Sequence, residues 1–182
     1  AALKTNAILI NACRGCVVNE LALKLFLSRR EDIMTVFDVW ADEPNIDSSL
    51  AHFVDIATPH IAGYSAEAKS NATKILARAF EKYFRLGATI DIEIGEGKSD
   101  ITIVESAAGK LSEWSTLLAA FPLVELNEQF KQALRKGAGA EAFDSLRQKL
   151  LKRREFISRQ LRKNIYSSDQ QRQLRVLGFR FE

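Results

Sequence analysis

The chain has 182 residues, enough for one medium-sized domain or two small ones, and 47% of them are hydrophobic, which is typical of a globular protein. Its 26 basic and 23 acidic residues give a formal charge of +3, so the overall balance indicates neither a nucleic-acid partner nor a membrane partner. No apolar run approaches the roughly 20 residues that span a bilayer, and no secretory signal opens the chain, so we expect a cytoplasmic protein. The first residue is Ala rather than Met, which suggests a piece of a longer polypeptide.

Three short apolar segments predict the strands of a parallel sheet, at residues 7–10, 33–40 and 54–57. The first segment is continuously apolar, as expected for a strand that is buried on both faces. Strand, helix, strand, loop and strand at this spacing predict part of a doubly wound α/β sheet.

Two helices are predicted in this first part of the chain. Asn19 can cap the first helix. The residues expected on its buried face are Ala22, Leu25 and Phe26. The second helix covers residues 66–86 and has apolar side chains at spacings of three and four, with Glu67 in its first turn and Gly87 just past its end.

The second half of the chain has weaker patterns. Gly and charged residues at 95–98, between two short alternating segments at 90–94 and 100–104, predict a domain boundary. Beyond it we expect helices at 111–120, 125–134, 141–154 and 169–177, and strands at 156–161 and 179–181. The predicted partition is therefore 1–64, a connecting segment 65–95, and a small α+β domain at 96–182.

The only cysteines, Cys13 and Cys16, form a Cys-x-x-Cys pair. A thioredoxin-like redox motif is one interpretation, but the pair follows a strand inside a different motif, and no further Cys or His pair lies nearby to complete a metal site. We therefore predict no metal and favour two reduced thiols in a cytosolic protein.

Three polar residues stand at the ends of the three predicted strands: Arg14, Glu43 and His60. The carboxyl ends of parallel strands meet at one edge of a sheet, where ligands bind, so these side chains can converge on one substrate. Each of these residues, taken alone, can be explained by an ordinary structural role. His60 is one of only two histidines, however, and the other, His52, has no motif around it.

A common chemistry connects the three residues. His60 can pass a proton to or from a substrate oxygen, and Glu43 is the candidate carboxylate to hold its second ring nitrogen. Arg14 can grip a substrate carboxylate through its planar guanidinium and polarise the neighbouring carbonyl. The oxidation of a 2-hydroxy acid by hydride transfer requires these three functions.

The motifs at residues 11–18, 38–44 and 58–64 resemble the C-terminal half of the nucleotide-binding domain in the D-isomer-specific 2-hydroxyacid dehydrogenases, over residues 6–85. The resemblance implies an α/β fold: the C-terminal half of a doubly wound, Rossmann-like parallel sheet, then a long helix and a small α+β dimerisation domain. Segments 143–147, 152–156 and 177–179 are similar to a C-terminal dimerisation domain found in one branch of this family.

The resemblance also implies a cofactor, a substrate and their ligands. NAD would be the cofactor, and the cofactor-binding residues would be Ala12, Cys13, Arg14, Asp38 and Gly63. Arg14, His60 and Tyr64 would bind a small phosphorylated 2-hydroxy acid. In catalysis Arg14 would assist, Glu43 would support the histidine, and His60 would be the proton donor when the ketone is reduced. A homodimer through residues 96–182 is expected, without a nucleic-acid or membrane partner.

The sequence departs from the family pattern in two ways. It contains no G-x-G-x-x-G turn, and we expect that the chain starts downstream of that turn. Cys16 and Asn19 stand where many relatives have Pro and Asp, which affects the loop and the helix cap more than the chemistry. Two alternatives stay open: another member of the family with a different 2-hydroxy acid, and a truncated, non-catalytic dimerisation or interaction module.

The segment 147–163 is rich in basic residues, namely Arg147, Lys149, Lys152, Arg153, Arg154, Arg159, Arg162 and Lys163. Clustered positive charge can indicate a nucleic-acid patch. Apolar residues alternate with the charges, so we favour a solvated face beside a packed one. A subunit contact that brings an arginine near a phosphorylated substrate is a further possibility.

Overall fold

The computed structural model describes residues 3–87 and 112–182. Two compact units divide the chain: the first comprises Ala1–Ala62 and Leu123–Leu150, and the second comprises Gly63–Pro122 and Leu151–Glu182. The domain boundary predicted at 95–98 and the alternating segments on either side of it lie outside the described residues. Each unit is described separately below.

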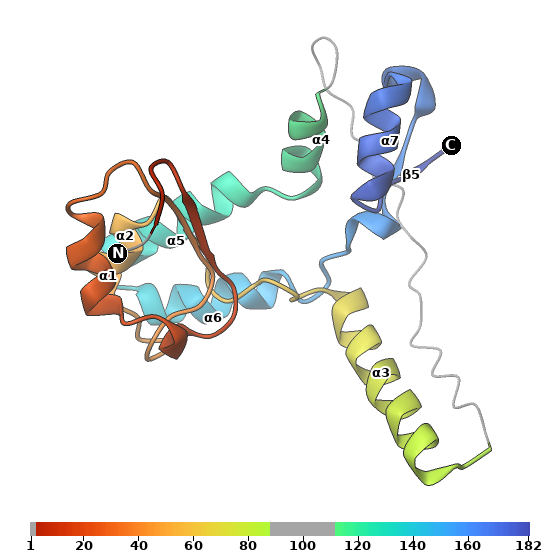
Figure 1. Cartoon of the computed structure of the whole chain (residues 1–182), viewed down its shortest axis with the longest axis horizontal. Coiled ribbons are helices and arrows are strands. Elements are labelled where there is room, and N and C mark those ends of the chain that lie inside the picture. Colours follow the sequence, from red (N-terminus) through yellow and green to blue (C-terminus); the bar gives the residue numbers. More distant parts are fainter. Residues whose placement is uncertain (1–2, 88–111) are drawn as a thin grey trace. The chain divides into compact units, whose positions relative to one another are not determined.

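A three-stranded parallel sheet forms the centre of the first unit (Figure 1). Its strands are β1 (Ile8–Asn11), β2 (Met34–Phe37) and β3 (Ile56–Ala57), in the order β1-β2-β3. Ile8 pairs with Met34 and Phe37 with Ala57. The predicted α/β class with a parallel sheet is thus confirmed, although β2 and β3 are shorter than the predicted segments.

Two helices connect the strands, α1 (Glu20–Leu27) between β1 and β2, and α2 (Ser48–Phe53) before β3. The predicted cap of α1 is confirmed, because Asn19 Oδ1 accepts a hydrogen bond of 2.9 Å from Ala22 N. Its predicted buried face is wrong: Leu23 and Leu27 are buried, whereas Leu25 is 59% exposed. The spacing of four places Leu23 and Leu27 on one side of the helix, and Ala22, Leu25 and Phe26 lie on its flanks.

One face of β1 and β2 is open to solvent. The side chains of Ile8 and Ile10 are 62% and 65% exposed, and that of Met34, opposite Ile8, is 52% exposed. The prediction that the first strand is buried on both faces is therefore wrong, because no described element covers this face.

Two further helices, α5 (Leu123–Arg135) and α6 (Gly139–Lys149), belong to the first unit and lie beside its sheet (Figure 1). The buried rings of Phe130 and Phe143 meet with their centroids 5.9 Å apart. Asn127 Oδ1 accepts a hydrogen bond from Ala57 N at 2.8 Å. The Nζ atom of Lys131 donates to the carbonyl oxygens of Val54 and Asp55, at 2.6 and 3.0 Å.

These contacts close the free edge of β3. Parallel pairing directs the backbone groups of alternate residues toward β2, so Asp55 O and Ala57 N face the other way. There they would be unpaired without the side chains of α5, at a cost typical of buried polar groups. The structure thus groups residues 123–150 with the sheet, a partition that differs from the predicted 96–182 domain.

The second unit contains α3 (Ala66–Phe84), α4 (Glu113–Ala120), α7 (Ser168–Val176) and a two-stranded parallel sheet of β4 (Gln160–Leu161) and β5 (Arg180–Phe181). Short 3₁₀ turns occupy Phe156–Ser158 and Lys163–Ile165. Among its described residues, the buried core comprises Ala120, Leu161, Tyr166, Leu174 and Phe179. The predicted strand at 156–161 is thus a turn followed by a two-residue strand.

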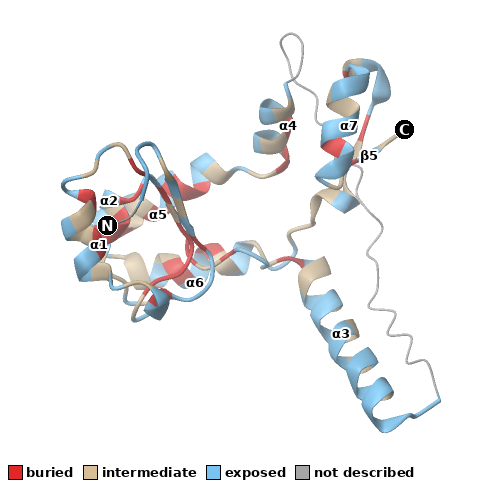
Figure 2. Cartoon of the chain, viewed as in Figure 1, coloured by how far each residue is buried: buried red, intermediate tan, exposed pale blue. Residues whose placement is uncertain are grey.

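Glu67 fastens the start of α3 to the C-terminal segment of this unit. Its carboxylate accepts hydrogen bonds from Arg154 Nε at 2.5 Å, Ser158 Oγ at 2.5 Å and Glu155 N at 3.0 Å. Beyond this anchor, α3 has no buried residue and is exposed along most of its length (Figure 2). The predicted long amphipathic helix is confirmed in length, and its apolar stripe is uncovered among the described residues.

Candidate active site

The loop after β1 carries Arg14 and is ordered by a buried asparagine. Asn11 is 5% exposed, and its Oδ1 accepts a hydrogen bond from Cys13 N at 3.2 Å, while its Nδ2 donates to Arg14 O at 3.4 Å. The Arg14 backbone is extended, with φ −151° and ψ 148°. Its exposed guanidinium donates from Nη1 to Cys13 O at 2.6 Å, and no hydrogen bond of Arg14 to Glu43 or His60 is present among the described residues.

Gly15 holds this loop against the segment that follows β2. A Cβ atom at position 15 would lie 2.0 Å from both the carbonyl carbon and the carbonyl oxygen of Trp40. Since no real Cβ approaches backbone so closely, only glycine allows the two segments to pack in this way. The Arg14 loop and the turn that leads to Glu43 are therefore neighbours.

Glu43 and His60 form the centre of the site. His60 Nδ1 and Glu43 Oε2 are 2.7 Å apart, and Glu43 Oε1 accepts a hydrogen bond from Trp40 N at 2.9 Å. Because the Glu43 carboxylate accepts a hydrogen bond, Nδ1 of His60 carries a proton. Nε2 is therefore the ring nitrogen that can take up or release a proton during a reaction. Nε2 has no hydrogen-bond partner within the described part of the chain, and the His60 side chain is 29% exposed.

Asp38 holds the loop on which His60 stands. Its carboxylate is buried and accepts hydrogen bonds from Thr58 Oγ1 at 2.6 Å, Ile61 N at 2.8 Å and Ala62 N at 2.9 Å. His60 N donates to the carbonyl oxygen of Asp38 at 2.7 Å. His60 itself has a positive φ of 53°, an uncommon backbone conformation that these hydrogen bonds fix.

Glu20, at the start of α1, links that helix to the same turn. Its Oε1 accepts a hydrogen bond from Ala41 N at 2.7 Å. Partial burial raises the pKa of Glu20 above its ordinary value; the Ala41 hydrogen bond opposes this, and the nearby Asp47 and Asp42 carboxylates add to it. The segment from Trp40 to Glu43 is thus held on two sides, by Gly15 and by Glu20.

The other predicted site residues divide between the two units. Ala12 and Cys13 are exposed at the carboxyl end of β1, beside Arg14. Gly63 and Tyr64 belong to the second unit. Gly63 is exposed with φ 71°, and the Tyr64 ring lies 4.0 Å from Lys69 Nζ, an arrangement of the cation–π type.

Sequence reasoning overlooked the residues that hold the site together. Asp38 is predicted to contact the cofactor, and in the structure its carboxylate also binds the backbone of the His60 loop. Thr58, which donates to Asp38, and Trp40, whose Nε1 donates to Thr58 O at 2.9 Å, were not assigned a role. A buried Asp and a Trp at strand ends were the available signals.

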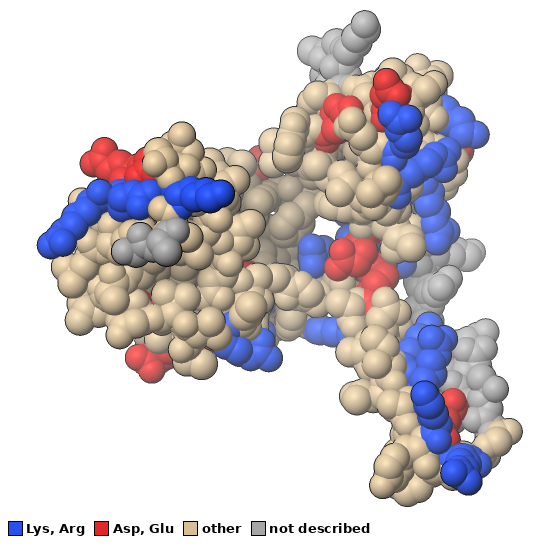
Figure 3. All heavy atoms as spheres, in the orientation of Figure 1, with Lys and Arg blue, Asp and Glu red and all other residues tan. Residues whose placement is uncertain are grey.

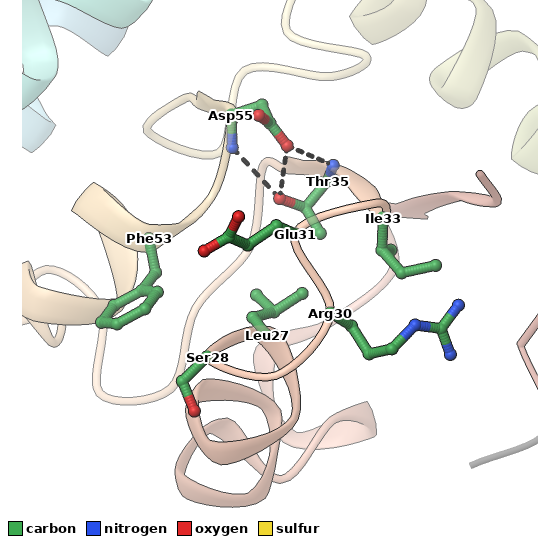
Figure 4. A pocket seen from close by; sticks show the side chains of 8 residues that line it. All are labelled: Leu27, Ser28, Arg30, Glu31, Ile33, Thr35, Phe53 and Asp55. Atoms are coloured by element: carbon green, nitrogen blue, oxygen red, sulfur yellow. Dashed lines mark hydrogen bonds between the residues drawn. The ribbon is translucent and has the colours of Figure 1, made fainter. Parts of the chain in front are cut away.

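A pocket lies at the end of β2 away from His60 (Figure 4). Its volume is about 380 Å³. Eight residues line it: Leu27, Ser28, Arg30, Glu31, Ile33, Thr35, Phe53 and Asp55. Asp55 Oδ2 accepts hydrogen bonds from both Thr35 N and Thr35 Oγ1, at 2.7 and 3.0 Å. Because Thr35 is near the start of its strand, this pocket is at the opposite end of the sheet from His60.

The basic segment 147–163 is partly engaged within the fold. Arg154 pairs with Glu67, and Arg153 Nε donates to Tyr64 O at 3.2 Å while its guanidinium lies 4.9 Å from the Phe121 ring centroid. The exposed members are Lys149, Lys152, Arg162 and Lys163. In Figure 3 the Lys and Arg side chains of the second unit gather along α3 and around α7. A solvated face beside a packed one fits this arrangement.

Within residues 3–87 and 112–182, no group of three or more His, Cys, Asp or Glu side chains is arranged to hold a metal ion. In the same residues, no helix combines the length and the apolar character needed to cross a bilayer.

The first 62 residues match the family model described as "D-isomer specific 2-hydroxyacid dehydrogenase, NAD binding domain". This match confirms the predicted resemblance: the segment that carries the sheet, Arg14, Glu43 and His60 is similar to the NAD-binding domain of that family.

The chain is also similar to curated proteins named erythronate-4-phosphate dehydrogenase. It is 37% identical to that of Escherichia coli O1:K1 / APEC over 162 residues, which cover 86% of this chain and 41% of the relative. It is 35% identical to that of Cellvibrio japonicus (strain Ueda107) over 192 aligned positions, which cover 99% of this chain and 50% of the relative. The chain therefore spans about half the length, or less, of these relatives.

Proposed function

We propose that this chain is the catalytic part of an NAD-dependent dehydrogenase that acts on the CH–OH group of a small phosphorylated 2-hydroxy acid. The observation that carries the proposal is the 2.7 Å contact between His60 Nδ1 and Glu43 Oε2 at the carboxyl edge of the parallel sheet. A histidine fixed by a carboxylate, with its other ring nitrogen free, is suited to proton transfer. The family match of the same segment supports NAD as the cofactor.

In this mechanism His60 Nε2 accepts the proton from the substrate hydroxyl during oxidation and returns it when the ketone is reduced. Arg14, exposed on the neighbouring loop, binds the substrate carboxylate through its guanidinium. NAD, when bound, supplies the acceptor for the hydride. The exposed backbone at Ala12 and Cys13, together with Asp38 and Gly63, would line the nicotinamide end of the cofactor, and Tyr64 would contact the substrate.

The narrower proposal for the substrate is 4-phospho-D-erythronate, oxidised to its 2-oxo acid during the synthesis of pyridoxal 5'-phosphate. Its support is the name shared by the relatives that match most of this chain. Another enzyme of the same family, such as phosphoglycerate dehydrogenase, is the alternative, and a substrate comparison separates the two.

We also propose that the protein is a cytoplasmic homodimer that pairs through residues 96–182. Its support is the number of large apolar side chains that the described part of this segment leaves exposed, namely Trp114, Leu118, Val124, Leu151, Ile157, Val176 and Leu177. Large apolar surfaces of this kind usually mark an interface.

A chimera tests the activity. The matching segment of the E. coli relative is replaced by this chain, and NADH formation is measured with 4-phospho-D-erythronate and with 3-phosphoglycerate. We expect turnover with the first substrate and little with the second. A chimera that folds and binds NAD but oxidises neither substrate would contradict the proposal, and a preference for 3-phosphoglycerate would favour the alternative.

A further inference from the structure

The two cysteines have no role in the proposed reaction. Cys13 and Cys16 are the only cysteines of the chain, and both are exposed free thiols on either side of Arg14 and Gly15. The proposed chemistry uses the backbone of Cys13 and neither sulfur atom. Accessible thiols separated by two residues are well placed for thiol–disulfide exchange.

We propose that Cys13 and Cys16 form a reversible intramolecular disulfide, and that this bond moves Arg14 out of the conformation it has in the reduced chain. The consequence for catalysis rests on the proposed function, because it assumes that Arg14 binds the substrate. The covalent change itself requires neither substrate nor cofactor and can be measured on this chain alone.

The structure fixes the segment on both sides of Arg14. Asn11 Oδ1 holds the amide of Cys13, and Gly15 is pressed against the Trp40 carbonyl, so neither neighbour can move far. Cys16 follows Gly15 directly and lies in the 3₁₀ turn Gly15–Val17. The residue between these two anchors is Arg14, whose carbonyl oxygen accepts hydrogen bonds from Asn11 Nδ2 at 3.4 Å and Val17 N at 3.2 Å, so a change in its backbone must break or remake these two bonds.

The extended backbone of Arg14 determines what closure requires. A disulfide joins residues whose Cα atoms are usually about 4.4–6.8 Å apart. An extended residue inside a four-residue segment holds the ends farther apart than a turn does, so closure requires φ and ψ of Arg14 to change. The hydrogen bond of 2.6 Å from Arg14 Nη1 to Cys13 O depends on the present conformation and would be lost or remade.

The oxidant is a low-molecular-weight disulfide such as oxidised glutathione. One cysteine thiolate attacks it, forming a mixed disulfide and releasing one thiol of the reagent. The other thiolate then attacks the sulfur of the first cysteine, which forms the Cys13–Cys16 bond and releases the second thiol. Two protein thiols lose their protons and two electrons, and the reagent is reduced to two thiols.

Closure against the anchors at Asn11 and Gly15 makes the bond easily reducible, as strained and exposed disulfides are. The guanidinium that would bind the substrate carboxylate is then displaced while the disulfide persists. A thiol reductant restores the active arrangement, so the site would respond to the redox state of its surroundings.

The first test measures bond formation on the 182-residue chain. The chain and its Cys13→Ser and Cys16→Ser variants are equilibrated in glutathione buffers of rising oxidised fraction, then alkylated and weighed intact. We expect the wild type to lose two hydrogen atoms and both alkylation sites, at oxidised glutathione concentrations at least about tenfold below those that modify either single variant. Stable mixed disulfides on both cysteines, or no such advantage, would overturn the proposal.

The second test measures Arg14. Oxidised and reduced chains are treated with phenylglyoxal, which modifies arginine, and peptides containing Arg14 and the exposed Arg29 are quantified. We expect the Arg14 reaction rate to change by at least about threefold on oxidation, with Arg29 unchanged and with recovery after a thiol reductant. A disulfide that forms without altering Arg14 would refute the second half of the proposal. Because neither test uses substrate or NAD, their outcome is separate from that of the chimera.

Discussion

The imidazole of His60 and the carboxylate of Glu43 are 17 positions apart in the sequence but 2.7 Å apart in the structure. Glu43 is held in turn by Trp40 N, and the loop of His60 is held by Asp38. The pair is therefore positioned by backbone hydrogen bonds from two strand ends, which gives it a defined orientation before any substrate arrives.

In the chimera, His60→Ala should reduce kcat by about 10²- to 10⁴-fold, the loss usual for a general acid or base. NAD affinity should change little, because the imidazole is assigned to proton transfer rather than cofactor binding. His52→Ala is the matched control, since His52 belongs to α2 and bonds Ser48 O. Steady-state kinetics measure kcat, and an NAD titration measures the affinity for the cofactor, in each variant. A His60→Ala protein that kept more than about a tenth of kcat would remove His60 from the mechanism.

Gly15→Ala should destabilise the first unit by more than about 2 kcal/mol, because the new methyl group meets the Trp40 carbonyl at 2.0 Å. Gly137→Ala, also in the first unit, is the control: Gly137 has φ 75° with nothing within 4 Å of its Cβ position, so only the conformational cost of about 1 kcal/mol applies. Urea unfolding followed by circular dichroism compares them. Equal losses would show that the close approach at Trp40 is not needed.

Asn127→Leu should cost about 1–3 kcal/mol, because Ala57 N is left without an acceptor at a buried position. Asn127→Asp keeps an acceptor at Oδ1 and should retain that backbone hydrogen bond, although it introduces a charge. Hydrogen exchange at Ala57 N distinguishes them, with faster exchange expected in the Leu variant only. Unchanged exchange in Asn127→Leu would mean that α5 does not protect the edge of β3.

Glu67 should make the second unit sensitive to acid. Burial raises its pKa, but hydrogen bonds from Ser158 and Arg154 outweigh burial and hold the pKa at about 2, below its usual 4.5. Since the folded pKa is lower than the unfolded one, this stabilisation is present above pH 4.5 and is lost as the pH falls toward about 2.

Glu67→Gln should therefore lower stability at pH 7 by about 1.5–3 kcal/mol and flatten its dependence on pH in that acidic range. Thermal unfolding from pH 7 to pH 2 measures this, with Glu113→Gln as the control because Glu113 is also in the first turn of a helix of the second unit. The same acid sensitivity in wild type and Glu67→Gln would assign the effect to other groups.

The 182-residue chain alone should associate as a dimer and show no NAD-dependent turnover. Its exposed apolar side chains favour association, and the sequence contains no G-x-G-x-x-G turn to receive the pyrophosphate of the cofactor. Light scattering at several concentrations and an NADH absorbance assay test the two parts. A chain that stays monomeric at every concentration would contradict the predicted dimer. Measurable hydride transfer would show that the chain does not need a G-x-G-x-x-G turn for turnover.

The sequence predicted the positions of strands, the cap at Asn19 and the long helix, because each has a local signal in periodicity or capping. It also predicted Glu43 as the partner of His60, since the chemistry requires a carboxylate and strand ends meet at one edge. The helix α2 was missed although Asp47 caps it, because its polar start was interpreted as loop.

The remaining features depend on contacts between distant residues. Asn127 meets Ala57 across 70 positions, so no local pattern could show that α5 belongs with the sheet. The exposure of Ile8 and Ile10 depends on whether another element covers that face of the sheet. An apolar run in the sequence predicts burial but does not show which element would cover it. The role of Asp38 in holding the His60 loop could not be predicted, because it depends on the direction of the backbone amides of Ile61 and Ala62.

The two borders of the parallel sheet are chemically unequal. On the outer side of β3, Asn127 and Lys131 satisfy the backbone, whereas on the outer side of β1 the peptide groups of Ile8 and Ile10 point away from β2, with exposed side chains beside them. A new strand can therefore pair with the sheet at one edge only. Any further strand, from whatever polypeptide, would join next to β1, and the same border is where uncontrolled strand addition would begin.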